Sequence, residues 1–197
     1  MRKVKIMGRQ FWKPGNMLYP LPAVMVSCQR KGEKPNIITL AWVGTICSDP
    51  AMVSISVRPE RYSHDIIAES GEFVINLVNA DTARTMDWCG VKSGRDFDKF
   101  KEMNLTPFES KTVAVPGILE CPVSIECKVK DMLKLGSHDM FLGEVTAVSV
   151  DDKYLEKDGK FNMADLNLVA YNHGEYNVLG DFVGKFGYSV EGTGRKR

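Results

Sequence analysis

The densest cluster of side chains that could bind an anion lies in the stretch SVRPERYSHD, residues 56–65. A strand is expected to run out at Arg58, and a helix is expected to begin near Ser63. The first turn of a helix offers free N–H groups and a partial positive charge, and Arg61 and His64 would add donors beside it. Arginine forms bidentate hydrogen bonds with phosphate oxygens. The stretch therefore predicts a monophosphate site; the alternative is an ordinary capped helix with solvated arginines.

A second polar cluster lies in KPNIITLAWVGTICSDPAM, residues 34–52. Asn36 and Thr39 place polar groups in a strongly apolar strand that runs to Trp42, and buried polar groups must find partners. Backbone amides and small residues at 41–45 could lie along the edge of a planar, polar ring. The stretch indicates a second part of a ligand site, although a tryptophan in such a place is more often a core residue.

A histidine occupies a reversal of the chain in KLGSHDMFLGEV, residues 134–145. A turn favours glycine, serine and aspartate for backbone reasons, but it does not require His138. The side chain is either a solvated turn residue or a ligand contact, and this stretch by itself leaves both interpretations open.

Strand patterns dominate the segments that must position these residues. Runs rich in β-branched or aromatic residues, several with period-two alternation, predict strands at residues 23–29, 36–42, 52–57, 72–78, 123–135 and 140–150. Turn signals separate these runs, among them the GSHD that contains His138. The segment 151–161 is expected to be a further irregular crossing.

Helix patterns are fewer and shorter. Ser63 is expected to cap a helix that has Asp65 in its first turn and ends at Gly71. Further helices are predicted at 81–88 and 95–103, the latter with acidic residues early and lysines late. Many antiparallel-looking strands with few helices predict a mainly β protein, a closed barrel with helical decorations, and not a doubly wound α/β sheet.

Composition argues against several functional classes. The chain has 197 residues, with 26 lysines and arginines against 25 aspartates and glutamates, so no charge excess indicates nucleic acid or a membrane surface as a partner. No apolar run approaches the roughly 20 residues of a membrane span, and the first residues lack the features of a secretory signal. Five cysteines without a CxxC argue against a metal site or a disulfide framework. They fit a reducing cytoplasm.

Glycine-rich phosphate loops are absent from the sequence. Neither GxGxxG nor GxxxxGKS/T occurs, which disfavours Rossmann-type dinucleotide binding and P-loop ATPases. A phosphate site in this chain would have to use side chains and a helix start.

The order and spacing of several motifs resemble a known family. YPLPAVMVS, KPNIITLAWVGTICSDPAMVSISVRPERYSHDII, GEFVINL, SGRDFDKF, LECPVSIECKV and GSHDMFLGEVTAV follow one another as in the flavoredoxin branch of the flavin reductase-like family. The likeness runs from about Met17 to Val190 and includes the closing YNVLGDFVGKFGYSV. Each motif is weak alone, but together they cover nearly the whole chain. One domain is expected over residues 1–190, followed by a disordered tail at 191–197.

The resemblance implies a fold, a cofactor and a site. Proteins that look like this adopt a split β-barrel of Greek-key type, bind FMN and usually form homodimers with the flavin near the interface. By resemblance, the cofactor contacts are Asn36, Thr39, Ala41 and Trp42 along the flavin ring and ribityl chain, Arg58 and Ser63 at the phosphate end with His64 and Arg61 as further candidates, Lys99 and His138 near the flavin, and Tyr171 at an often aromatic position.

The implied activity is an FMN-dependent oxidoreductase. Electrons would pass from NAD(P)H or a small redox protein such as ferredoxin, through FMN, to an acceptor. Hydride and electron transfer are the flavin's own chemistry, so no acid–base pair is needed, and Asp96 and Asp98 fit a helix cap and a salt-bridge partner. A reduced flavin is negatively charged, and Lys99 or His138 could stabilise that charge or hold the phosphate instead.

Two other interpretations are compatible with a bound flavin. The first is a non-enzymatic carrier or store of FMN, which the sequence does not distinguish from an enzyme. The second is a split-barrel branch similar to the pyridoxamine phosphate oxidases, which the stretches NIITLAW and GSHDMFLGEV disfavour.

Overall fold

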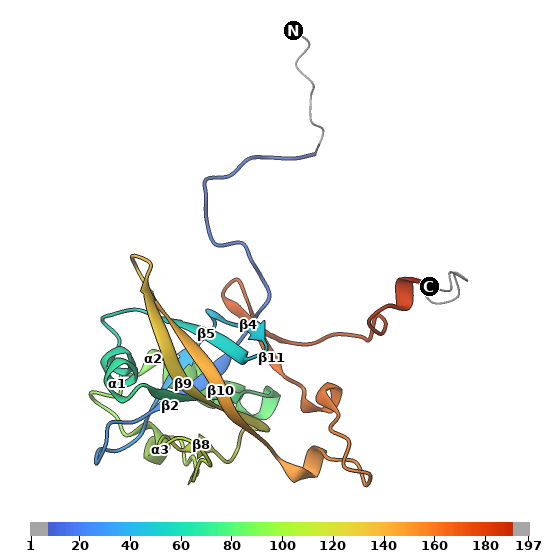
Figure 1. Ribbon diagram of the computed structural model, residues 1–197. Coiled ribbons are helices and arrows are strands. Elements are labelled where there is room, and N and C mark those ends of the chain that lie inside the picture. The colour runs from blue at the N-terminus through green and yellow to red at the C-terminus, as the bar shows by residue number, and fades with distance from the viewer. Residues whose placement is uncertain (1–7, 191–197) are drawn as a thin grey trace.

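A computed structural model describes residues 8–190 of the chain (Figure 1). The strands are β1 Leu21–Pro22, β2 Val24–Cys28, β3 Asn36–Leu40, β4 Val43–Ser48, β5 Ala51–Val57, β6 Glu72–Leu77, β7 Pro107–Phe108, β8 Gly117–Ile118, β9 Val123–Lys134, β10 Asp139–Val150, β11 Val169–Asn172 and β12 Glu175–Val178. The helices are α1 Tyr62–Ser70, α2 Ala83–Val91 and α3 Lys99–Glu102, with 3-10 turns η1 Ala80–Thr82, η2 Asp152–Tyr154, η3 Met163–Leu166 and η4 Tyr188–Val190.

The main sheet closes on itself at one corner. Its seven strands run in the order β3-β2-β6-β9-β10-β5-β4, so its two edge strands, β3 and β4, are neighbours in the chain. Ala41 and Trp42 join them, and the Trp42 carbonyl accepts a hydrogen bond from the Ser56 N–H of β5 at 2.9 Å. The edges therefore meet at this corner and part elsewhere, which confirms the mainly β split barrel predicted from the sequence. A second sheet, β1-β11-β12, lies beside the same corner (Figure 1).

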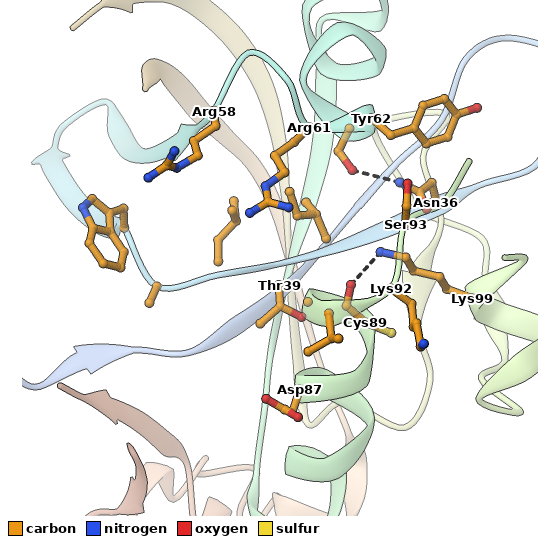
Figure 2. Close-up of a pocket in the computed structure, with 18 of the residues that line it drawn as sticks. Asn36, Thr39, Arg58, Arg61, Tyr62, Asp87, Cys89, Lys92, Ser93 and Lys99 are labelled. Carbon is orange, nitrogen blue, oxygen red and sulfur yellow. Dashed lines mark hydrogen bonds between the residues drawn. The ribbon is translucent and has the colours of Figure 1, made fainter. Parts of the chain in front are cut away.

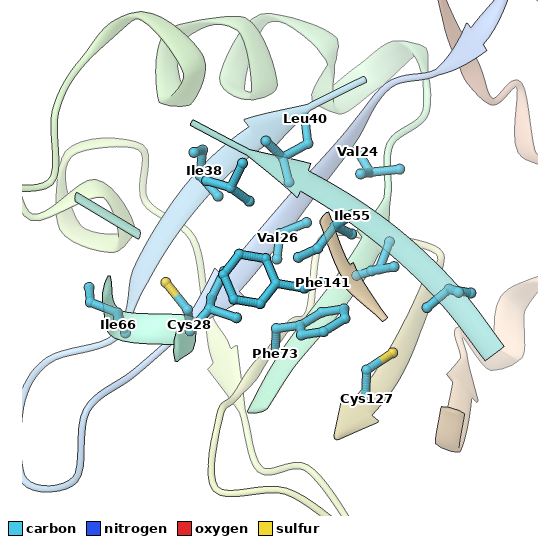
Figure 3. Packing of buried hydrophobic residues seen from close by; sticks show 14 residues of the cluster. Val24, Val26, Cys28, Ile38, Leu40, Ile55, Ile66, Phe73, Cys127 and Phe141 are labelled. Atoms are coloured by element: carbon cyan, nitrogen blue, oxygen red, sulfur yellow. The ribbon is translucent and has the colours of Figure 1, made fainter. Parts of the chain in front are cut away.

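Strand β2 is buried on both faces, because the barrel interior lies on one side and helices lie on the other. Val24, Val26 and Cys28 point into the barrel core (Figure 3). Met25 points the other way and packs in a second core with Met86 of α2. Period-two alternation thus supplies both cores from one strand, and each fully buried side chain of this size stabilises the fold by roughly 1.5–3 kcal/mol.

The β9–β10 hairpin is the longest feature and carries the predicted turn. The Leu135 N–H donates to the His138 carbonyl at 3.0 Å across the turn, and Gly136 has φ of +98°, a conformation that favours glycine. Further along β10, a Cβ at Gly143 would lie 2.6 Å from Cζ of Phe73. Glycine there lets the phenyl ring pack directly against the strand.

The start of helix α1 differs from the prediction. Arg61, not Ser63, is the N-cap residue, and within the described chain no side chain caps the helix. Ser63 is buried in the first turn, two residues after the N-cap, and its hydroxyl accepts a hydrogen bond from Asn36 Nδ2 at 2.8 Å. The predicted Asp65 in the first turn and the left-handed Gly71 at the C-terminus are confirmed.

The ends of other helices and strands also differ from the prediction. The predicted helix at 95–103 shortens to α3, with Asp98 as the N-cap that accepts from the Lys101 N–H and also pairs with Lys34. The predicted strand at 36–42 ends at Leu40, where the barrel corner begins. The short strands β1, β4, β7, β8, β11 and β12 were not predicted. The tail at 191–197 lies outside the described residues, and the single domain over 1–190 stays a prediction.

Within residues 8–190, no helix is both long and apolar enough to cross a membrane.

Candidate functional site

A pocket of about 520 Å³ opens at the barrel corner, between β3, the start of α1, the end of α2 and the β11–β12 hairpin (Figure 2). Its volume falls within the range of small-molecule sites. The sequence-predicted residues that line it are Asn36, Thr39, Ala41, Trp42, Arg58, Arg61, Ser63, Lys99, His138 and Tyr171. The fold therefore brings together segments that are far apart in the sequence.

One end of the pocket is strongly cationic. Among the described residues, Arg61, Lys92, Arg95 and Lys99 line this end, whereas Arg58 lies beside His138; the acidic side chains of the pocket are Glu60 and Asp87. Glu60 lies 3.4 Å from Arg58 in an exposed ion pair. The Arg61 side chain points into the pocket (Figure 2). An excess of fixed positive charge in a concave site favours an anionic ligand.

Lys99 is a buried cation held by carbonyl groups. Its Nζ donates to the Ile37 carbonyl at 2.7 Å and to the Cys89 carbonyl at 2.6 Å (Figure 2), and the residue is 4% exposed. Burial lowers the pKa of Lys99, and the positive charge of Arg61 acts in the same direction. An ammonium has three donors, so one is left for a ligand. In the part of the chain that the structure describes, no carboxylate pairs with it, so a bound anion would supply the missing countercharge.

Asn36 connects the elements around the cationic end. Its Nδ2 donates to Ser63 of α1, and a Cβ placed on Gly94 would lie 2.1 Å from its Oδ1. Only glycine fits at position 94, so the segment after α2 packs directly on the Asn36 side chain. Ser63 accepts this hydrogen bond, and its own hydroxyl hydrogen can be donated to the Cys28 sulfur or to a ligand.

Thr39 faces helix α2 as well as the pocket. Its hydroxyl donates to the Met86 carbonyl, and a Cβ at Gly90 would lie 3.0 Å from the Thr39 Cβ. The hydroxyl hydrogen is thus used to hold α2 against β3. The side chain shapes the pocket wall, and a role in binding the cofactor stays a prediction.

The other end of the pocket is aromatic. The rings of Trp42 and His138 are parallel to within 3°, with centroids 6.1 Å apart, and Tyr171 lies 6.3 Å from Trp42. Tyr176 extends this wall and donates to Asp87 Oδ1 at 2.9 Å. Burial and the Asp87 carboxylate raise the pKa of Tyr176 to about 12. Flat aromatic side chains suit a planar ring ligand.

The surroundings of His138 favour its uncharged form. Burial lowers its pKa, and the positive charge of Arg58 lowers it further. A neutral imidazole both donates and accepts hydrogen bonds. Ser137 Oγ lies 2.9 Å from Nδ1, which leaves the other nitrogen for a ligand.

His64 is the predicted contact that the structure places elsewhere. Its Nε2 lies 2.9 Å from Asp139 Oδ2, and its Nδ1 lies 2.9 Å from Asp65 Oδ1, and it does not line the pocket. Successive residues of a helix point about 100° apart. Ser63 lines the pocket, whereas the His64 ring turns towards Asp139 of β10.

Several pocket residues were missed by the sequence analysis. Lys92, Ser93 and Arg95 line the pocket from the segment after α2. They lie in and just before SGRDFDKF, so a search for basic and hydroxyl residues beside Gly94 could have found them. Asp87 and Tyr176 meet only through the fold, and no local signal marks either one.

A mainly β split barrel with a cationic and aromatic pocket defines a class of flavin-associated proteins, and comparison with known proteins agrees. The chain belongs to the flavin reductase like domain family, whose model matches residues 17–180. Flavoredoxin of Desulfovibrio vulgaris (Miyazaki F) superposes with a TM-score of 0.85 at 30% identity, covering 93% of this chain and 100% of that chain. Flavoredoxin from Methanosarcina acetivorans gives 0.83 at 27% identity, with 93% and 98% covered.

Sequence relatives include proteins without an assigned role and one redox protein. An uncharacterized protein of Archaeoglobus fulgidus is 33% identical over 159 residues, 81% of this chain and 86% of the relative. A high molecular weight rubredoxin of Moorella thermoacetica is 27% identical over 123 residues, 61% of this chain and 52% of that protein. The chain thus spans about half of the rubredoxin.

Proposed function

We propose that this protein is an FMN-binding oxidoreductase of the flavin reductase or flavoredoxin type. The observation that carries the proposal is the composition of the pocket, which has Arg61 and Lys99 at one end and the Trp42–His138 wall at the other, with Arg58 beside His138. FMN has a matching polarity, because a phosphate and a planar ring stand at its opposite ends. Family membership supports a flavin ligand.

The residues fit such a group by their chemistry. The arginines at the start of α1 can bind phosphate oxygens, and the uncapped first turn adds N–H groups and a partial positive charge. The buried ammonium of Lys99 favours negative charge on the bound molecule. FMN would supply hydride and electron transfer when bound; the side chains orient it, and the aromatic wall limits water at the ring.

The electron donor is proposed to be NAD(P)H or a small redox protein such as ferredoxin. The likeness to a Moorella thermoacetica protein named rubredoxin supports the second class. Steady-state turnover of the FMN-loaded protein with NADH, NADPH, reduced ferredoxin and reduced rubredoxin tests the proposal. Turnover with any one of them supports an oxidoreductase, whereas tight FMN binding without reduction by any of them would assign a carrier of FMN.

A homodimer is proposed as the working form. The segments 8–18 and 179–190 leave the barrel body (Figure 1) and expose large apolar side chains, among them Phe11, Trp12, Phe182 and Phe186. Exposed apolar surface on this scale marks an interaction surface. A second copy would cover it. The five free cysteines, four of them buried, are compatible with a reducing cytoplasm as the proposed location.

A further inference from the structure

The imidazole of His64 joins two parts of the barrel below the pocket. It is 8% exposed, and its Nε2 reaches Asp139 Oδ2 at 2.9 Å. The Asp139 side chain is 8% exposed, whereas that of Asp65, the partner of Nδ1, is 61% exposed. The ring also packs edge-on against Phe141, with centroids 5.4 Å apart. The buried contact with Asp139 is therefore the one shielded from water, where a hydrogen bond is stronger.

The two residues of this pair stand at special positions in the chain. Asp139 is the first residue of β10 and pairs with Val57, the last residue of β5. His64 lies in the first turn of α1, three residues after the N-cap Arg61. The backbone pairing fixes one end of the segment 58–63, and the His64–Asp139 contact fixes the other end to the same strand.

The segment 58–63 carries two of the positive charges that line the pocket. Arg58, Arg61 and Ser63 all line the pocket from it. A six-residue segment tied at both ends to one strand has few conformations left to lose when a ligand binds. A preorganised site binds more tightly because less conformational entropy is lost when the ligand binds.

We propose that His64 and Asp139 are positioning residues, which hold the 58–63 segment in the shape that binds a phosphate group without touching the ligand themselves. The inference rests on the proposed function, since it takes FMN as the ligand. It accounts for a buried histidine–carboxylate pair that the pocket does not use. Loss of the pair should weaken the binding of a phosphorylated flavin by about tenfold. This is the affinity change expected when one hydrogen bond near the upper end of the usual range of strengths is lost.

Riboflavin separates positioning from general stability, because it has the flavin ring but lacks the phosphate. The apoproteins of wild type, Asp139→Ala and Asp139→Asn are titrated with FMN and with riboflavin by flavin fluorescence. We expect Asp139→Ala to lose about tenfold in FMN affinity with riboflavin affinity within about twofold of wild type. Asp139→Asn keeps an oxygen that can accept from His64 Nε2 and should stay close to wild type.

A second variant covers the case in which Asp139→Ala does not fold. His64→Leu combined with Asp139→Leu replaces both polar partners by apolar ones, a change that folds tolerate, and it should show the same selective loss for FMN. Trypsin gives a readout without flavin. Arg58 is protected because Pro59 follows it, so faster cleavage after Arg61 in the apoprotein variants would report a released segment.

The outcomes are distinct. Selective loss of FMN affinity with faster cleavage after Arg61 supports the positioning role. Equal losses for FMN and riboflavin, or affinities and cleavage rates that match wild type, would overturn it. Wild-type protein that binds neither flavin would instead contradict the proposed function, and the cleavage rates after Arg61 would then still decide whether the pair holds the segment.

Discussion

The ring planes of Trp42 and His138 lie within 3° of each other, although one residue is at the barrel corner and the other is in the β9–β10 turn. Strand β5 connects the two. The Trp42 carbonyl accepts from the Ser56 N–H, and Ser56 pairs with Met140, two residues beyond His138. The barrel register therefore fixes the aromatic wall, and His138 has a structural reason to face the pocket.

His138→Ala should change the flavin while leaving the fold nearly intact. A turn residue contributes little packing, so the free energy of unfolding should change by no more than about 0.5 kcal/mol. Loss of one hydrogen bond of roughly 1 kcal/mol at the ring would move the two-electron midpoint potential by about 20 mV. Spectroelectrochemistry and thermal unfolding of both proteins check this. A potential, spectrum and FMN affinity equal to wild type would make His138 a turn residue only.

The sequence predicted the barrel well because its strands are long and patterned. The β9 and β10 runs alternate clearly and lie at 123–134 and 139–150, close to the predicted bounds. The β11–β12 hairpin was not predicted, because its strands have only four residues each. His173 and Gly174, both at positive φ, form its two-residue turn, and a histidine–glycine pair is a weak turn signal.

The site was predicted in part. Asn36 was singled out as a polar residue in an apolar strand and Lys99 through the resemblance, and both line the pocket. Their hydrogen bonds were not predicted, because the partners lie far away in the chain: Asn36 bonds Ser63, and Lys99 bonds the Ile37 and Cys89 carbonyls. Pairings of this kind depend on tertiary packing and have no period in the sequence.

Arg58→Ala combined with Arg61→Ala should weaken FMN binding far more than it destabilises the protein. Each charge-assisted hydrogen bond is worth roughly 1.5–3 kcal/mol, so the pair should reduce affinity by on the order of a hundredfold or more. Both side chains are at the surface of the pocket, so thermal unfolding of the apoprotein should change little. Lys128→Ala, on the exposed face of β9, is the matched control. Unchanged FMN affinity in the double variant would show that the segment is an ordinary helix start and not a phosphate site.

Because the pKa of Lys99 is lowered, two properties should change with pH in opposite directions: the free energy of unfolding and the affinity for FMN. The folded apoprotein binds fewer protons at Lys99 than the unfolded chain between the lowered pKa and the usual value of about 10.4. In that window Lys99 makes the free energy of unfolding rise with pH. FMN affinity should fall over the same window, because the binding ammonium loses its charge.

Lys99→Met is the control for this titration. This variant should bind FMN more weakly at neutral pH. Its FMN affinity should also fall less at alkaline pH, because Lys99 no longer loses a charge. Titration of the flavin itself affects both proteins equally. FMN titrations at stepped pH values give the comparison. Parallel affinity curves for wild type and Lys99→Met would show that the ammonium does not serve the ligand.

Loss of the exposed aromatic side chains in residues 179–190 should change the assembly state. We expect wild type to have twice the 22.0 kDa chain mass in light scattering, because the exposed residues of 179–190 need a covering surface. Phe182→Ser combined with Phe186→Ser keeps the chain length and should shift the protein towards the monomer. A clean wild-type monomer with FMN bound would remove the proposal that the protein works as a dimer.

FMN binding is tested most directly by mass analysis of the flavin released from the purified protein, together with titration of the apoprotein. We expect a yellow protein that releases FMN, with about one FMN per chain after reconstitution. FAD as the sole bound flavin would contradict the assignment of the cationic end to a single phosphate. Failure of the folded apoprotein to bind FMN at all would contradict the central claim.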